Sequence, residues 1–313
     1  MTKYNEELLD SNIRPVDNGE KTQVAAGRSS RGRRRGLGNA LGAIPFIAYI
    51  GVFLALPAVS VIATAFQDGN GKFTLSNFNE AVHGVYLKSF VASIELSFVA
   101  ALVAVVVGLL AALAVSSTSN SVVRSLVTAG SGVFANTGGV PLAFSFIATV
   151  GNFGIITKLL KSAGIDIYAH GFSLYSVTGL AIVYQYFLIP LMVLIMLPPI
   201  QAIRKEWVDA SQSLGASRSQ FWRWIGIPLL LPPIFAAFIV LFTDSFAAYA
   251  TAQALTSGTI PLVPIQLGAL ISGNVLAGQT NLGDALGAGM ILIVVLAGVI
   301  YATIQRRTSR WLR

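Results

Sequence analysis

The stretch QAIRKEWVDASQSLGASRSQFWRWIGIP, residues 201–228, separates two long apolar runs and is itself patterned like folded protein. In its first half, charged residues alternate with apolar side chains at helical spacing, at Ile203, Trp207, Ala210 and Leu214. This spacing puts the apolar side chains on one face. It predicts a short amphipathic helix.

A turn and a second helix follow in the same stretch. Gly215 stands where a helix often ends, because glycine adopts a left-handed backbone at little cost. Ser217 is suited to cap a second helix that extends through Trp224. Pro228 then opens the next apolar run.

The runs on either side belong to a set of segments long enough to cross a bilayer, which takes about 20 mostly apolar residues in a helix. With 54% hydrophobic and 11% charged residues, the chain has too few charges to cover a water-facing surface. We expect an all-α integral membrane protein with an amphipathic cytoplasmic helix between transmembrane helices 4 and 5. Its six helices lie near residues 43–66, 90–116, 125–150, 174–199, 229–250 and 284–305, and Gly, Asn and Thr interrupt the third and fifth.

The cations sort by side of the membrane under this six-span arrangement. Of the 21 Lys and Arg residues, all but four fall in the N-terminal tail, the C-terminal end or the two loops on the same side. Cytoplasmic loops are enriched in positive charge, so both termini are predicted to be cytoplasmic. The four on the other side are Lys72, Lys88, Lys158 and Lys161.

The N-terminal segment differs in composition from the rest of the chain. Residues 1–40 contain the run GRSSRGRRRG without apolar periodicity, which predicts a disordered basic cytoplasmic tail rather than a signal peptide. Residues 41–313 form the six-helix domain, with the polar stretch as a loop at 200–228. The arginines at 31–35 are expected to contact anionic headgroups, and a nucleic-acid arm is the alternative.

The sequence lacks the residues and motifs that metal binding and several kinds of catalysis require. The chain has no cysteine and two histidines, His83 and His170, so we expect no metal site and no bound cofactor. No phosphate-binding loop, H-E-x-x-H or G-x-S-x-G motif occurs, and neither histidine lies in a predicted span. The chain is therefore not expected to be an enzyme.

The polar stretch resembles a known motif. Asp209-Ala210-Ser211, three residues, Gly215, nine residues and then Ile225-Gly226-Ile227-Pro228 resemble the EAA loop of type I ABC importer permeases, whose pattern is E-A-A, three residues, G, nine residues, I-x-L-P. Asp209, Ser211 and Ile227 depart mildly from it. The segment DASQSLGAS resembles the corresponding segment in the polyamine, aminophosphonate, ferric and sulfate group of these permeases.

The resemblance implies a role for the loop and a set of partners. The loop would be a coupling helix that docks in a groove of a separate ATPase subunit, which uses ATP and Mg. The partners would be an ATPase dimer, a second permease that is more often different than identical, an external solute-binding protein and the lipid of a bacterial inner membrane, but no nucleic acid. The coupling residues would be Trp207, Asp209, Ala210, Ser211, Leu214, Gly215 and Ala216.

Acidic side chains inside predicted spans mark a candidate solute path. Glu95 and Asp244 lie in the second and fifth spans with no Lys or Arg deep enough to pair with them, which favours a cationic or zwitterionic solute. Asn136, in the segment NTGGVPLAF, is a third candidate, although small residues there also suit helix packing. A structural role for both acids stays open. We expect a polyamine or aminophosphonate permease, with sulfate or ferric ion, or an ion-coupled secondary carrier, as alternatives.

Overall fold

The structure is a computed structural model that describes residues 44–169, 171–272 and 280–309. These residues are helical apart from turns, loops and one isolated bridge between Gln67 and Phe73. The predicted tail at 1–40 lies outside the described residues. The chain divides into two compact units, residues 1–54 and 55–313, and the packing described below belongs to the second.

The prediction of six long apolar helices is confirmed for the described part of the chain. Six candidate spans are Ile44–Ala65, Gly84–Ser117, Val140–Ser162, Val177–Gln201, Arg218–Ala247 and Thr280–Gln305. The first includes the π-helical turn η1 (Gly51–Ala55) and α2 (Leu56–Ala65). Five of the six fall close to the predicted segments.

The third span was predicted wrongly as one helix over 125–150. The chain instead forms α5 (Ser121–Ala135), α6 (Val140–Val150) and α7 (Ile155–Ser162), and the third candidate span comprises α6, the turn after it and α7. The break has a local cause, since Gly139 has φ of 79° and a proline follows at the start of α6.

The centre of the second unit is the contact between α4 (Gly84–Ser117) and α8 (Val177–Gln201). Small residues of α4 let the two helices approach closely. A Cβ added at Gly108 would lie 2.6 Å from the Cβ of Met192, and Gln185 of α8 donates from Nε2 to the Ala100 carbonyl at 3.2 Å. Both helices are lined with buried side chains here, so this core is closed by the chain's own contacts.

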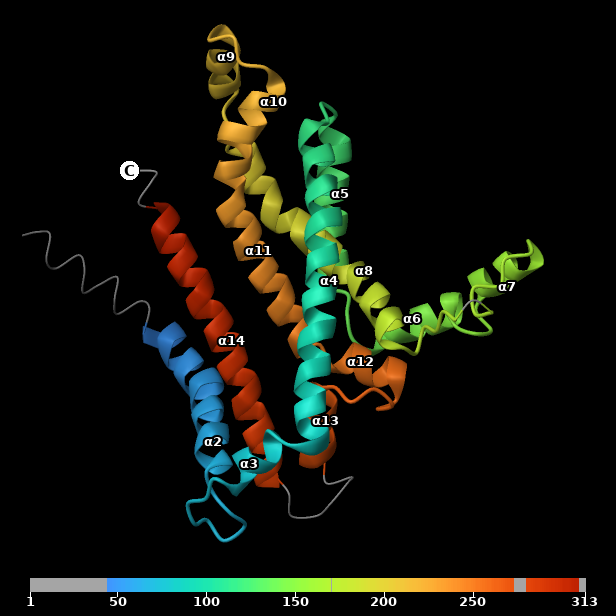
Figure 1. Cartoon of the computed structure of the whole chain (residues 1–313), viewed down its shortest axis with the longest axis vertical. Coiled ribbons are helices and arrows are strands. Elements are labelled where there is room, and N and C mark those ends of the chain that lie inside the picture. The colour runs from blue at the N-terminus through green and yellow to red at the C-terminus, as the bar shows by residue number, and fades with distance from the viewer. Residues whose placement is uncertain (1–43, 170, 273–279, 310–313) are drawn as a thin grey trace, which may run out of the picture. The chain divides into compact units, whose positions relative to one another are not determined.

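The remaining helices are arranged around this pair (Figure 1). The helix α11 (Ile227–Ala247) packs on α4, α8 and α14 (Thr280–Ser309), while α5 packs on α8. Two short helices connect α11 to α14: α12 (Tyr249–Thr256) packs on α6, and α13 (Val263–Ile271) packs on α14 and α4. The Tyr184 hydroxyl donates to the Ala248 carbonyl at 3.0 Å and ties α8 to the start of α12.

The start of α14 is held by α2, α3 (Ser76–Ala81) and the loop between them. The Thr64 hydroxyl donates to Asp284 Oδ2 at 2.7 Å. Asn281 Nδ2 donates to the carbonyls of Gln67 and Asp68, at 2.7 and 2.9 Å. The Asp284 carboxylate therefore has a hydrogen-bond donor, the Thr64 hydroxyl, within the bundle.

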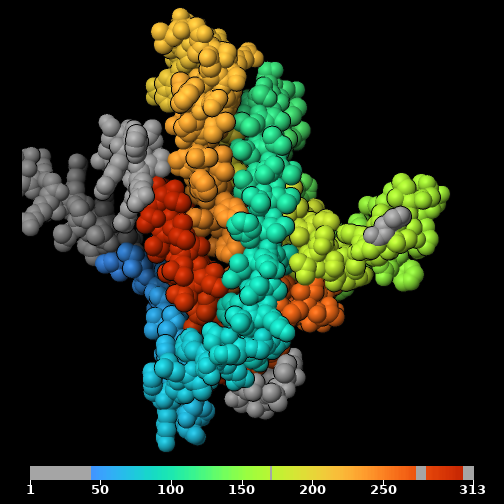
Figure 2. Space-filling model, viewed as in Figure 1, coloured from blue at the N-terminus to red at the C-terminus, as the bar shows by residue number. Residues whose placement is uncertain are grey.

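The polar stretch forms α9 (Lys205–Ser213) and α10 (Arg218–Phe221), which project at the end of the bundle where α4 stops and α5 begins (Figures 1 and 2). Arg124, in the first turn of α5, lies at this same end. The loop with Lys72 lies at the opposite end, near the start of α14. Arg124 and Lys72, which the sequence analysis assigned to opposite sides of the membrane, therefore lie at opposite ends of the bundle.

Candidate functional site

The turn after α9 has the conformation that the sequence predicts. Gly215 has φ of 82°. Its N–H donates to the Gln212 carbonyl at 2.9 Å, and the Ala216 N–H donates to the Ser211 carbonyl at 3.0 Å. These two bonds form a Schellman motif, which satisfies carbonyls at the end of α9 and reverses the chain tightly. The result is a compact knob.

The second helix begins with a capping box, as expected for Ser217. Its hydroxyl accepts from the Gln220 N–H at 3.2 Å, and Gln220 Oε1 accepts from the Ser217 N–H at 2.7 Å. The helix does not end near Trp224. It continues through the π-helical segment η2 (Trp222–Gly226) directly into α11, because Gly226 leaves room for the Trp222 ring, which a Cβ at that position would meet at 2.4 Å.

The predicted coupling residues divide between outward and inward positions. Leu214 is 89% exposed, Trp207 is 40% exposed, and Asp209, Ala210 and Gly215 are exposed as well. Ser211 is buried, with its hydroxyl donating to the Val208 carbonyl at 2.7 Å, and Ala216 is half-buried. The knob therefore leaves an apolar side chain, Leu214, and a carboxylate, Asp209, exposed.

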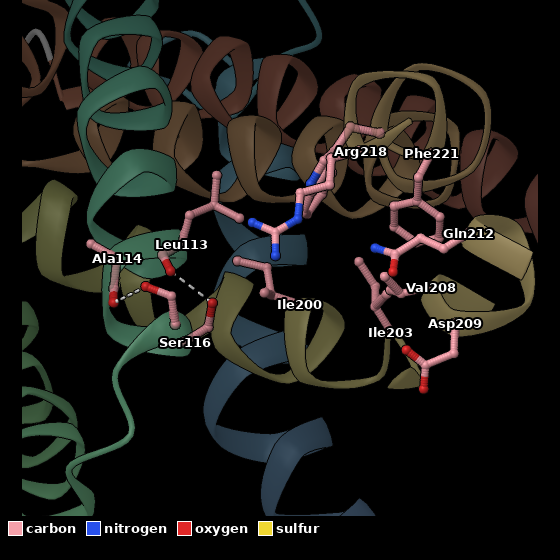
Figure 3. Close-up of a pocket in the computed structure, with 12 residues that line it drawn as sticks. Leu113, Ala114, Ser116, Ile200, Ile203, Val208, Asp209, Gln212, Arg218 and Phe221 are labelled. Carbon is pink, nitrogen blue, oxygen red and sulfur yellow. Dashed lines mark hydrogen bonds between the residues drawn. The ribbon is translucent and has the colours of Figure 1, made fainter. Parts of the chain in front are cut away.

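A cavity of ≈ 730 Å³ separates the knob from the end of α4. It is lined by Ser116 and Ser117 on one side and by Val208, Asp209 and Arg218 on the other. Figure 3 shows the Asp209 carboxylate and the Arg218 guanidinium apart in the cavity, and Asp209 makes no ion pair within the described residues. The carboxylate is thus available to a cation of another molecule.

A second cavity, of ≈ 500 Å³, joins two of the three predicted pathway residues. Asp244 of α11 and Asn136, which follows α5, both line it, and the Asn136 amide donates to the Gly132 carbonyl at 2.8 Å. Glu95 does not line it, since this acid lies exposed on α4. The two acids are therefore not a pair.

Sequence reasoning missed the other side chains of this cavity, among them Phe187, Tyr249 and Thr251. The Thr251 hydroxyl accepts from the Gly139 N–H at 2.8 Å and so fixes the glycine turn against α12. No Lys, Arg or His lines the cavity. Across the described residues, no three His, Cys, Asp or Glu side chains gather as they would around a metal ion.

Six apolar helices long enough to cross a bilayer, a solute-sized cavity beside α11 and a projecting polar knob continuous with that helix are the features of a membrane transport subunit. The family model of the binding-protein-dependent transport system inner membrane component matches residues 104–313. This chain belongs to that family, and it is a multi-pass permease subunit of an ABC importer.

Two kinds of relatives agree with this membership. The chain is 32% identical over 120 residues to the spermidine/putrescine transport system permease protein PotC homolog of Mycoplasma genitalium, a match that covers 38% of this chain and 40% of the relative. It also resembles a bacterial ABC transporter involved in the import of the acidic polysaccharide alginate, with TM-score 0.67, 18% identity and coverage of 89% of this chain and 96% of the other. The alginate transporter in complex with an alginate pentasaccharide-bound periplasmic protein gives TM-score 0.66 at the same identity and coverage. At this identity the structural likeness establishes the fold.

Proposed function

We propose that this permease passes an amine-bearing solute, either a cationic polyamine or a zwitterionic aminophosphonate. The observation that carries the proposal is Asp244, a carboxylate that lines a solute-sized cavity without any cationic side chain beside it. An ammonium group would neutralise this carboxylate, whereas sulfate or phosphate would be repelled by it. The partial match to a spermidine/putrescine permease homolog points to the same class of solute.

The aromatic side chains of the cavity support the same choice. Phe187 and Tyr249 line it together with Asp244. The face of an aromatic ring attracts an ammonium group, and methylene groups of a diamine pack well on such rings. A polyamine presents both kinds of group in alternation, so the lining suits its methylene segments as well as its charge.

The same helix links this cavity to the knob. Through η2, α11 is continuous with α10, and Asp244 lies near the far end of α11. We propose that Leu214 enters a groove of the ATPase subunit while Asp209 pairs with a cation there, so that closure of the ATPase dimer around ATP and Mg displaces α11 as a rigid rod. The cavity wall at Asp244 would then move with the knob.

The proposal includes the orientation and the partners. Both termini and the knob face the cytoplasm, where the ATPase is, and the external solute-binding protein delivers the amine to the other side. A second permease, different from this chain, closes the path that one bundle leaves open. The family membership favours this assembly over an ion-coupled secondary carrier, which would need no knob.

Uptake by proteoliposomes containing the permease pair, the ATPase and the solute-binding protein tests the solute class. We expect labelled putrescine or spermidine to accumulate with ATP, and Asp244→Asn to lower uptake at least tenfold. Glu95→Gln is the matched control, because this acid lies outside the cavity, and it should leave uptake nearly unchanged. Uptake of sulfate without uptake of amines would refute the proposal.

A further inference from the structure

A groove of ≈ 490 Å³ lies at the knob end of the bundle, near the start of α11, whereas the Asp244 cavity lies near the end of that helix. Its walls come from α8, α11 and α14, and Trp207 of α9 completes it. The lining is apolar except for the edges of Trp207 and Tyr301 and the amide of Gln305. Trp207 is one of the predicted coupling residues, whereas the other six and the residues of the Asp244 cavity do not line this groove.

The groove is open because its walls are built from short or ring-shaped side chains. Proline or alanine stands at five of the lining positions, which are Pro199, Ala202, Pro232, Pro233 and Ala236. None of these side chains is long or flexible enough to reach across and fill the space. An apolar groove of this kind needs an apolar occupant, because leaving such a surface exposed is unfavourable.

The position of the groove indicates what that occupant is. Its walls on α8, α11 and α14 all lie within candidate membrane spans, close to where α8 ends at Gln201 and the last span ends at Gln305. This is the depth at which acyl chains meet their headgroups.

Cations close in sequence to the lining residues favour an anionic occupant of the groove. Arg204 and Lys205 are exposed just before Trp207, and the sequence continues with two arginines directly after Gln305. The acids of α9 are Glu206 and Asp209, and Asp209 lines the cavity beside α4 instead of this groove. The basic tail at 1–40, with eight cations, is a poor occupant, because it is polar and these side chains would repel it.

We propose that the groove binds an anionic phospholipid, with one acyl chain along α11 and the headgroup phosphate held by Arg204 and Lys205. Cations at a membrane surface attract anionic lipid in this way. The bound chain packs against Trp207, so the lipid supports the base of the knob from inside the bilayer. This site is separate from the proposed amine path and does not depend on the identity of the solute.

Quenching of Trp207 fluorescence by brominated lipids tests the proposal. The full-length chain with Trp222, Trp224 and Trp311 changed to Phe keeps Trp207 as its one tryptophan. In nanodiscs of phosphatidylcholine, brominated phosphatidylglycerol should quench Trp207 several-fold more efficiently than the same fraction of brominated phosphatidylcholine. Because each cation near the membrane surface contributes up to about fivefold, Arg204→Gln with Lys205→Gln should abolish this preference.

The control is Arg218→Gln, because Arg218 is also an exposed cation at this end but lines the cavity beside α4 instead of the groove. It should keep the preference for the anionic lipid. Equal quenching by both brominated lipids would overturn the proposed headgroup recognition. Absence of quenching by either lipid would mean that a protein segment, from a second permease or from this chain, fills the groove, and the proposal would then be wrong.

Discussion

The contact between α4 and α8 is closely packed, whereas the knob formed by α9 and α10 is largely exposed. In the first, Gly108 and its alanine neighbours bring two backbones close enough that even a methyl group at Gly108 would clash with Met192. In the second, Leu214 is 89% exposed and the neighbouring Asp209 has no ion-pair partner within the described residues. One region is closed by contacts within the chain, while the other leaves an apolar side chain and a carboxylate exposed.

Because of this difference, we expect mutations in the two regions to affect different properties, folding stability in one and association with a partner in the other. Changes in the α4–α8 contact are expected to act on the fold and, through it, on everything else. Changes on the outer face of the knob are expected to leave the fold intact and to act on association with the ATPase. The two kinds of effect can be measured independently in the purified protein.

The largest expected effect is that of Gly108→Leu. The added side chain meets Met192 and the Ile189 carbonyl, which lies 3.1 Å from an added Cβ, so the helices must separate. We expect a loss of about 3 kcal/mol in the free energy of unfolding, measured by thermal or denaturant unfolding in detergent. Gly298→Leu is the control, since nothing lies within 4 Å of a Cβ at that position of α14. Equal losses from both variants would show that the close approach at Gly108 is not special.

The next effect concerns association alone. Leu214→Ser should weaken binding of the ATPase by about 2 kcal/mol, which corresponds to roughly thirtyfold. The reason is that a leucine side chain no longer enters the groove proposed on the ATPase subunit. The unfolding midpoint should not change. Leu214→Met keeps an apolar side chain of similar volume and should keep most of the binding, which co-purification and a binding titration measure. A loss of stability instead of binding would place Leu214 in the fold.

A smaller effect is expected for Gly215→Ala, which forces a side chain into the left-handed backbone of the turn. The strain amounts to about 1.5 kcal/mol, although no neighbour lies within 4 Å of the added Cβ. Faster hydrogen exchange of the amides at the end of α9 should report it. Gly215→Asn should be milder, because asparagine tolerates this conformation better. Identical exchange in all three proteins would contradict the role assigned to the glycine.

The smallest effect is expected for Ser217→Ala, which removes one half of the capping box. The loss should be about 1 kcal/mol and confined to α10 and η2, where hydrogen exchange can detect it. Ser219→Ala, two residues further and without a capping bond, is the matched control. If both variants exchange alike, the cap does not hold the start of the second helix.

The sequence predicted the knob well because its structure is local. The spacing from Ile203 to Leu214, the glycine at 215 and the serine at 217 each determine a backbone conformation within a few residues. Secondary structure of this kind needs no distant partner, so the turn and the cap were found where they were expected. The continuation of α10 into α11 was missed, because a π-helical segment depends on how Trp222 packs over Gly226.

The third span was predicted wrongly for a related reason. Apolar composition over 125–150 satisfies the criterion for a bilayer span, yet the chain turns at Gly139, where Thr251 from a segment 112 residues away receives the glycine N–H. Only the folded chain brings these two residues together. The same packing puts Asn136 beside Asp244 and leaves Glu95 outside the cavity.

The sequence by itself determined five of the six long helices, the family motif and the sorting of charge, since hydrophobicity, periodicity and the conformational preferences of glycine and serine act on neighbouring residues. The tertiary structure decided which polar side chains share a cavity, which apolar residues stay uncovered and where a groove remains between α8, α11 and α14. Those properties depend on distances between residues far apart in the chain, and the packing of whole helices sets these distances.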